Sequence, residues 1–122
     1  MILLNDFYTL LQKDFAPGVV KAKIAINKNH RILEGHFPGL PVVPGVCMLQ
    51  MVREIMEVNS GRELDIKEAD NMKFLSIINP EQNNEIDVLI NYTEDSDKIS
   101  ISATLFSGTT TFFKLKATLK SA

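Results

Sequence analysis

The sequence predicts an α+β domain in which an antiparallel β-sheet curls around one long buried helix. Residues 45–58 are apolar on every side except one narrow stripe, which is typical of a helix enclosed by protein. The residues after them alternate between apolar and polar in short runs separated by turn sequences, as antiparallel strands with one dry face do. With 122 residues, 45% of them hydrophobic, the chain is long enough to bury a core, and residues 1–122 are expected to form one domain.

The N-terminal third is expected to contain one short helix and one strand. Asn5 and Asp6 suit the N-terminal cap of a helix that runs to about Lys13, and the Ala-Pro-Gly sequence at 16–18 ends that helix. Over residues 20–27 apolar and polar side chains alternate, which predicts a half-buried strand.

The central helix is expected from residue 45 to residue 58, where Asn-Ser-Gly follows and ends it. Its polar residues fall at i, i+3, i+4 and i+7 and share one stripe: Gln50, Arg53, Glu54 and Glu57. We expect Glu54 to pair with Arg53 or to lie in solvent. Cys47 belongs to the apolar remainder of the helix and is expected to pack in the core.

Four strands are expected after the helix, and together with the strand before it they form a sheet whose apolar face needs a cover. They are centred on residues 71–78, 86–92, 99–105 and 113–119. A long helix inside a curled antiparallel sheet is the hotdog arrangement. A generic α+β sandwich fits the same periodicity nearly as well.

Composition excludes several classes of function. The net charge of −2, with scattered lysines, gives no basic surface for nucleic acid. A single cysteine rules out an internal disulfide framework. The first eleven residues have no basic start, and two polar residues interrupt their apolar run, so they suit neither a signal peptide nor a membrane span. A cytoplasmic protein is therefore expected.

The stretch GHFPGLPVVPGVCMLQ, residues 35–50, combines unusual rigidity with a histidine. Its three prolines each fix one φ angle and restrict the residue before: Pro38, Pro41 and Pro44. Such a loop holds few conformations and suits a site whose geometry matters. Gly39 and Gly45 let the backbone approach another group closely.

His36 in this loop precedes the start of the central helix. Gly45 lies at that start, where backbone N–H groups lack intrahelical partners and carry partial positive charge. A neutral imidazole beside such donors is a base next to an oxyanion site. This pair suits removal of a proton α to a carbonyl, because the charge that forms moves onto the carbonyl oxygen.

The same stretch resembles the β-hydroxyacyl-acyl carrier protein dehydratases of fatty acid synthesis, which are hotdog enzymes that work as dimers or larger assemblies. The resemblance rests on GHFPG followed by the further prolines and the apolar helix. It extends to Asn29 and to the segment MKFLSIINPEQNNEIDVLI, and it covers roughly residues 19–119. It implies a homodimer or a trimer of dimers.

The resemblance also implies roles for individual residues. His36 matches the histidine that removes the α-proton of a 3-hydroxyacyl thioester, and the N–H of Gly45 matches the donor that polarises the thioester carbonyl. The substrate-contacting positions are Phe37, Pro38, Gly39 and Val46, of which Phe37 and Val46 would line the acyl tunnel. The substrate would arrive on the phosphopantetheine arm of acyl carrier protein or as an acyl-CoA thioester. Neither a bound cofactor nor a metal is implied.

Gln50 departs from the family, which has a glutamate or aspartate there that approaches the histidine from the other subunit. Glutamine has the shape of glutamate but no proton to give, and a missing general acid costs about 10²- to 10⁴-fold in rate. Three interpretations remain open. The protein is a dehydratase in which Gln50 holds the leaving hydroxyl, a degenerate subunit that binds carrier protein or pairs with an active homologue, or a thioesterase.

Overall fold

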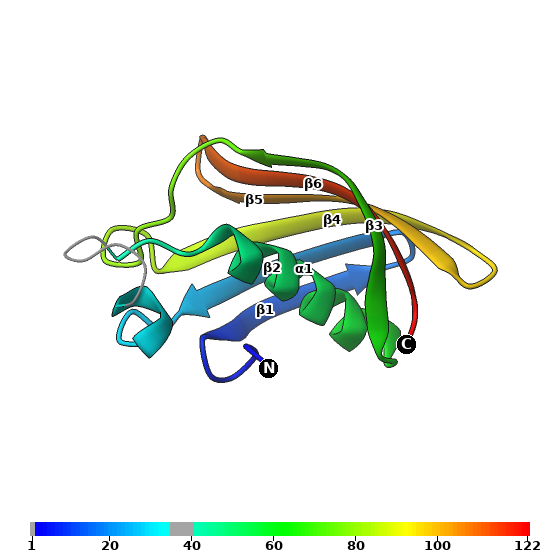
Figure 1. Ribbon diagram of the computed structural model, residues 1–122, viewed down its shortest axis with the longest axis horizontal. Helices are drawn as coiled ribbons and strands as arrows, with labels where there is room; N and C mark the ends of the chain where they lie inside the picture. Colours follow the sequence, from blue (N-terminus) through cyan, green and yellow to red (C-terminus); the bar gives the residue numbers. More distant parts are fainter. Residues whose placement is uncertain (1, 35–40) are drawn as a thin grey trace.

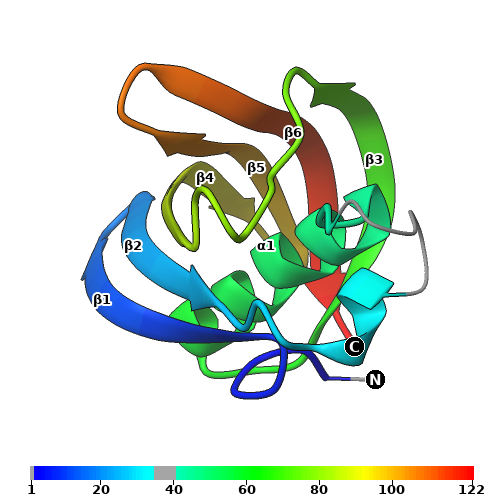
Figure 2. The same cartoon turned by 90° about the vertical axis from the view of Figure 1, so that its left-hand side faces the viewer.

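Within residues 2–34 and 41–122, which the computed structural model describes, one six-stranded antiparallel sheet curls around one long helix (Figure 1). The elements in chain order are β1 (Tyr8–Ala16), β2 (Val19–Ile26), the 3-10 turn η1 (Arg31–Glu34), α1 (Gly45–Ser60), β3 (Leu64–Phe74), β4 (Glu85–Asp95), β5 (Lys98–Ser107) and β6 (Thr110–Ser121). The strand order across the sheet is β1-β2-β4-β5-β6-β3. Figure 2 shows the sheet bending around the axis of α1. The predicted hotdog arrangement is confirmed.

The helix predicted at the N-terminus is wrong. Residues 8–16 form β1, which pairs with β2 from Tyr8↔Ile26 to Ala16↔Val19. Asn5 does reverse the chain, with a φ of 67°, but the chain leaves this turn extended rather than helical. Most residues of β1 are exposed and a bulge interrupts its register, so the strand has no alternating pattern. Pairing with β2 outweighs the weak local preference for helix.

The central helix is confirmed and runs two residues further than predicted, to Ser60. Gly61 ends it in the left-handed conformation, with a φ of 72° and its N–H bonded to the carbonyl of Glu57. The buried residues of α1 are Cys47, Met48, Met51, Val52, Glu54, Ile55 and Met56. They pack against the inward faces of the strands, where the predicted alternating residues of β2, β4, β5 and β6 are buried. None of the helices in the described ranges is long and apolar enough to cross a membrane.

Strand β3 forms the edge of the sheet beyond β6. It begins seven residues before the predicted strand at 71–78 and ends at Phe74, so the two overlap only in part. Of its 11 residues only Leu64 is buried. Its early part, LDIKEAD, carries no alternation that would have revealed a strand, and two register shifts interrupt its pairing with β6.

Candidate functional site

The predicted site residues divide between the described and undescribed parts of the chain. His36, Phe37, Pro38 and Gly39 lie outside the described residues. Gly45, Val46 and Gln50 lie on the first two turns of α1. The geometry of the site is therefore built from the start of this helix and from the segments that contact it.

The start of α1 is a turn capped by backbone alone. Pro44 occupies the N-cap position in an extended conformation, and its carbonyl accepts hydrogen bonds from the N–H groups of Cys47 and Met48 at 3.0 and 3.3 Å. Pro44 offers no side-chain cap. The N–H groups of the first turn point out of the helix end, where the helix dipole is positive.

Gly45 lies directly against the ring of Phe74. A Cβ built on Gly45 would lie 2.6 Å from Cε1 and 2.8 Å from Cζ of the Phe74 ring, closer than real contacts of this kind. The ring in turn lies 5.1 Å from the ring of Phe113, centre to centre, which limits where it can move. The glycine predicted to bring its backbone close to a ligand therefore also admits an aromatic ring from the last residue of β3.

An open pocket of about 350 Å³ adjoins this helix start. Its walls come from the segment before α1, from the first turns of α1, and from residues 74–77 after β3: Val42, Val43, Pro44, Gly45, Met48, Phe74, Leu75, Ser76 and Ile77. Large apolar side chains at and beside this pocket are exposed, with Val46 at 69% and Ile77 at 62%. Val46, expected to line an acyl tunnel, thus lies at the surface of the single chain.

Gln50 is held by Glu54, one turn further along α1. Nε2 of Gln50 donates a hydrogen bond to Oε2 of Glu54 over 2.9 Å. The side chain of Gln50 is half-buried. Gln50 and Glu54 therefore share one face of α1, as the predicted polar stripe requires, and they are bonded to each other.

Glu54 is not in solvent and not paired with Arg53, so this expectation is wrong. It is 4% exposed, the one buried polar or charged residue among those that the structure describes. Its carboxylate accepts hydrogen bonds from the N–H groups of Leu3 and Leu4 at 2.8 and 3.0 Å and from the hydroxyl of Tyr8 at 2.9 Å. The N-terminal turn folds over α1 and supplies these donors, while Arg53 pairs with Glu57 at 3.1 Å.

The pKa values of Tyr8 and Cys47 are both raised by the burial of these side chains and by the nearby charge of Glu54. Burial, followed by the Glu54 charge and the hydrogen bond to it, raises the pKa of Tyr8 far above its usual value, so its hydroxyl stays a donor. Burial and, to a lesser degree, the same charge raise the pKa of Cys47. Cys47 is buried and remains a thiol, as expected of a core residue.

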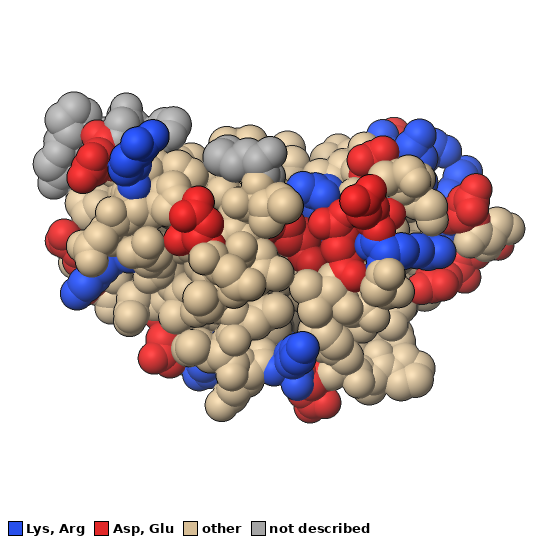
Figure 3. All heavy atoms as spheres, turned by 90° about the horizontal axis from the view of Figure 1, so that it is seen from below, with Lys and Arg blue, Asp and Glu red and all other residues tan. Residues whose placement is uncertain are grey.

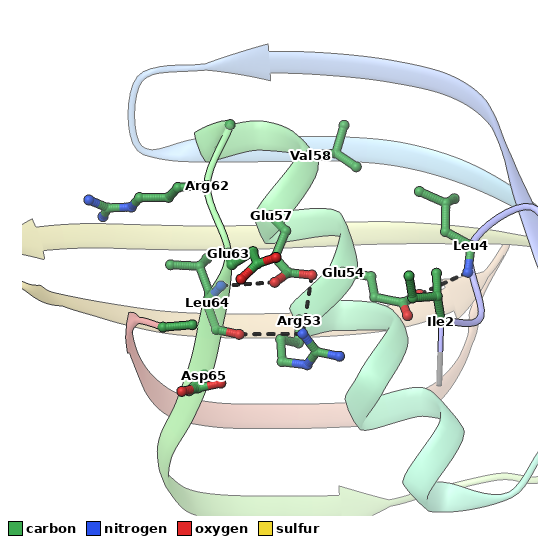
Figure 4. Close-up of a pocket in the computed structure, with 12 residues that line it drawn as sticks. Ile2, Leu4, Arg53, Glu54, Glu57, Val58, Arg62, Glu63, Leu64 and Asp65 are labelled. Atoms are coloured by element: carbon green, nitrogen blue, oxygen red, sulfur yellow. Dashed lines mark hydrogen bonds and ion pairs between the residues drawn. The ribbon is translucent and has the colours of Figure 1, made fainter.

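A second pocket, of about 600 Å³, lies over the C-terminal half of α1 (Figure 4). Acidic and basic side chains mix on this face (Figure 3), and several are engaged with one another. Arg53 pairs with Glu57 and donates to the carbonyl of Leu64, whose own N–H donates to Glu57. These interactions tie α1 to the start of β3, and we assign them to the fold.

Comparison with solved structures shows which fold this arrangement has. A chain of a structure described as the dehydratase heterocomplex ApeI:P from Xenorhabdus doucetiae has a TM-score of 0.74 and 19% identity, covering 91% of this chain and 96% of that one. An uncharacterized protein from Erwinia carotovora subsp. atroseptica has a TM-score of 0.69 and 19% identity, covering 93% of each chain. These similarities establish the hotdog fold.

The sequence itself identifies the family. The model of the ApeI-like family, described as ApeI dehydratase, matches residues 12–111, and the chain belongs to this family. Curated relatives include the 3-hydroxyacyl-acyl-carrier-protein dehydratase FabZ of Fusobacterium nucleatum, 28% identical over 76 residues that make up 58% of this chain and 54% of that one. The FabZ of Haemophilus influenzae is 34% identical over 65 residues, 52% of this chain and 44% of that one. The matched region thus spans about half the length of these relatives.

Sequence reasoning missed the acceptor role of Glu54. The i, i+4 spacing of Gln50 and Glu54 was visible and places both on one helix face. The other donors were hidden, because Tyr8 is predicted in an N-terminal helix that does not form and nothing in the sequence indicates that the chain at Leu3 folds over α1.

Proposed function

We propose that the protein removes water from a 3-hydroxyacyl thioester to give the trans-2-enoyl thioester. The observation that carries this proposal is the match of residues 12–111 to a dehydratase family, with the GHFPG sequence inside the matched region. The start of α1 supports it, because Gly45 places the positive end of a helix beside an apolar pocket. The substrate would be carried by acyl carrier protein or by coenzyme A, and no bound cofactor is needed.

The proposed reaction uses one base and one oxyanion donor. The imidazole of His36 takes the α-proton, and the electron pair of the broken C–H bond moves onto the thioester oxygen. The N–H of Gly45 stabilises the charge on that oxygen. When the thioester carbonyl re-forms, the electron pair moves into a new double bond between Cα and Cβ. The bond from Cβ to the hydroxyl oxygen then breaks. Since the amide of Gln50 has no proton to give, the imidazolium of His36 delivers the proton that turns the leaving hydroxide into water.

The active assembly in this proposal is a homodimer, alone or as a trimer of dimers. Strand β3 is a long edge strand, and an exposed edge is a template for pairing with another strand. Exposed apolar side chains gather next to its end: Val46, Phe74, Leu75 and Ile77. Pairing of two β3 edges would cover this surface and would let His36 of one subunit approach Gln50 of the other.

Hydration of crotonyl-CoA, the reverse reaction, tests the proposed function. The wild type should catalyse it, and His36→Ala should lose about 10²- to 10⁴-fold in rate, the usual contribution of a general base. His30→Gln is the matched control, since the chain has two histidines. Nε2 of His30 lies 3.0 Å from Oδ2 of Asp6 and its Nδ1 accepts from the N–H of Ile32, so its role is structural. Equal rates in wild type and His36→Ala would refute the base role.

The second candidate is a subunit that needs an acid-bearing homologue. Gln50 favours it, and the similar chain from Xenorhabdus doucetiae comes from a structure described as a heterocomplex. In that case the purified homo-oligomer would be inactive towards crotonyl-CoA. Activity would appear only when a hotdog chain with glutamate or aspartate at the position of Gln50 is co-expressed and forms a mixed complex.

A further inference from the structure

The outer face of the sheet, which is turned away from α1, carries a groove of about 260 Å³ where β5, β6 and β3 lie side by side. The residues that alternate with its polar lining along β5 and β6 are buried in the core, so the lining side chains point outward. Among the residues that the structure describes, no aspartate, glutamate or arginine lines it. The polar lining of this lysine groove consists of Asn71, Lys73, Ser102, Thr104, Lys114 and Lys116.

Strand register brings together lysines that are widely separated in the sequence. Lys73 of β3 lies directly opposite Lys114 of β6, and Lys116 follows on the same face of β6. All three side chains are exposed. Residues opposite each other on antiparallel strands have Cα atoms about 5 Å apart, and residues two positions apart on one strand about 7 Å. The three lysines therefore start within about 9 Å of one another.

These charges are not neutralised within the described part of the chain. None of the three lysines forms an ion pair with another described residue, and their neighbours on β5 are the uncharged Thr104 and Ser102. Lys23, on the same face of the sheet, differs because it pairs with Asp87 of the adjacent strand at 3.6 Å. Like charges directly opposite each other on two strands are destabilising. An anionic partner would relieve this repulsion.

The groove suits carboxylates better than phosphates. Phosphate sites use backbone N–H groups at helix ends or in turns, or the planar fork of an arginine. The N–H groups of β6 are bonded within the sheet, because β6 lies between β5 and β3. Beyond the groove, Glu68 and Asp65 lie on the same face, opposite Thr118 and Lys120. The basic surface therefore ends within one strand and would neutralise few of the phosphates that a nucleic acid presents.

We propose that the lysine groove docks a protein that presents acidic side chains along one face of a helix. A helix satisfies its own backbone hydrogen bonds, so it can lie on a sheet face whose backbone groups are already paired. Its carboxylates at i, i+3 and i+4 are about 5–6 Å apart, a spacing close to that of the three lysines. The hydroxyls of Ser102 and Thr104 and the amide of Asn71 can donate further hydrogen bonds to these carboxylates.

The complex is weak and forms quickly. Ion pairs between exposed side chains each contribute little to affinity, but a set of complementary charges steers association. Pairing of two β3 edges, as proposed for the dimer, extends the sheet within its own plane and leaves the lysine groove open. The groove contains none of the residues of the proposed catalytic site, so this inference does not depend on the dehydratase function.

An NMR titration with a synthetic helix tests the docking. The probe is an alanine-rich peptide of about twenty residues, long enough to form a helix in water, with glutamates at i, i+4 and i+7 on one face. Added to ¹⁵N-labelled protein at about 0.15 M salt, where attraction beyond about 8 Å is screened, it should shift backbone amide signals of β3, β5 and β6. Signals of β1 should not move. The absence of shifts, or shifts spread over the whole chain, would overturn the proposal.

A triple variant removes the charges of the groove. Lys73→Gln, Lys114→Gln and Lys116→Gln together also remove the repulsion between the three side chains, so the protein should remain folded. The affinity for the peptide should fall about tenfold or more, the combined contribution of three exposed ion pairs. An unchanged affinity would contradict the proposal.

The matched control makes the same change of net charge elsewhere, in Lys21→Gln, Lys23→Gln and Lys28→Gln. Strand β2, which carries the first two, lies three strands from β6, or about 14 Å, which exceeds the screening length. The affinity should therefore stay within about twofold. An equal loss in both triple variants would mean unspecific attraction and would refute the docking surface.

Inorganic triphosphate and a single-stranded oligonucleotide distinguish phosphate ligands from an acidic protein. Both should bind more weakly than the peptide, because the groove has neither arginine nor unpaired backbone N–H groups to hold a phosphate. Tighter binding of either one, with shifts of the same signals and loss in the triple variant of the groove, would overturn the proposal in favour of a phosphate site.

Discussion

Removal of the buried carboxylate at position 54 should destabilise the protein through its donors rather than through lost volume. In Glu54→Leu the side chain keeps a similar size, but Leu3 N–H and Tyr8 O–H lose their acceptor. Both groups belong to core residues, with exposures of 0% and 1%. The substitution therefore strands two buried donors.

The cost follows from the number of stranded donors. A buried donor without a partner costs about 1–3 kcal/mol, so two such donors give a loss of about 2–6 kcal/mol. A chain of 122 residues has an unfolding free energy of about 6–18 kcal/mol. The loss is a large fraction of that stability and corresponds to a fall in Tm of about 10–25 °C.

Urea unfolding of four proteins isolates this effect. Tyr8→Phe in the wild type removes a hydrogen bond to a charged group and should cost about 1.5–3 kcal/mol. In the Glu54→Leu background the same change removes a stranded hydroxyl, so it should cost nothing or stabilise. The double-mutant cycle should give a coupling of at least about 1.5 kcal/mol. Additive effects of the two substitutions would refute the reasoning.

Three further predictions concern the helix start, the sheet edge and the core thiol. Gly45→Ala should lower Tm because its methyl group meets the ring of Phe74, and the double variant with Phe74→Ala should recover part of that loss in a thermal melt. Ile77→Glu, at 62% exposure beside the β3 edge, should shift the protein towards monomer in sedimentation velocity. Leu11→Glu on the opposite edge strand β1, at 48% exposure, is the control and should not. Dissociation by both substitutions or by neither would contradict the proposed interface. Cys47 should react with a thiol reagent at pH 8 only after urea is added, because burial both covers it and raises the pKa of its thiol, and rapid labelling of the folded protein would contradict this.

The parts of the fold that the sequence predicted are those in which local pattern and final environment agree. The inward residues of β4, β5 and β6 alternate with polar ones, because one face meets α1 and the other meets solvent. The helix ends where Gly61 can adopt a positive φ that other residues rarely take. Both signals lie within a few residues of the structure that they specify.

The edge strands and Glu54 could not be predicted in this way. Strands β1 and β3 have a neighbour on one side only, so their side chains are largely exposed and lack a two-residue period. The environment of Glu54 depends on backbone N–H groups, which every residue except proline carries and which leave no trace in the sequence. For the candidate site, the motif predicted the helix start at Gly45, whereas the loop residues from His36 to Gly39 lie outside the described ranges.

The order of strands in the sheet has a consequence for how the chain folds during synthesis. Strand β2 lies between β1 and β4, and Val19 pairs with Asn91. This pairing cannot form until the ribosome has added about seventy further residues. The donors at Leu3 and Tyr8 likewise leave the ribosome well before Glu54 can accept from them. The β1–β2 hairpin therefore emerges with one edge unpaired and its apolar face uncovered, a state that invites association with other chains. Because contacts so distant in sequence slow folding, this nascent hairpin is the segment that we expect chaperones to bind.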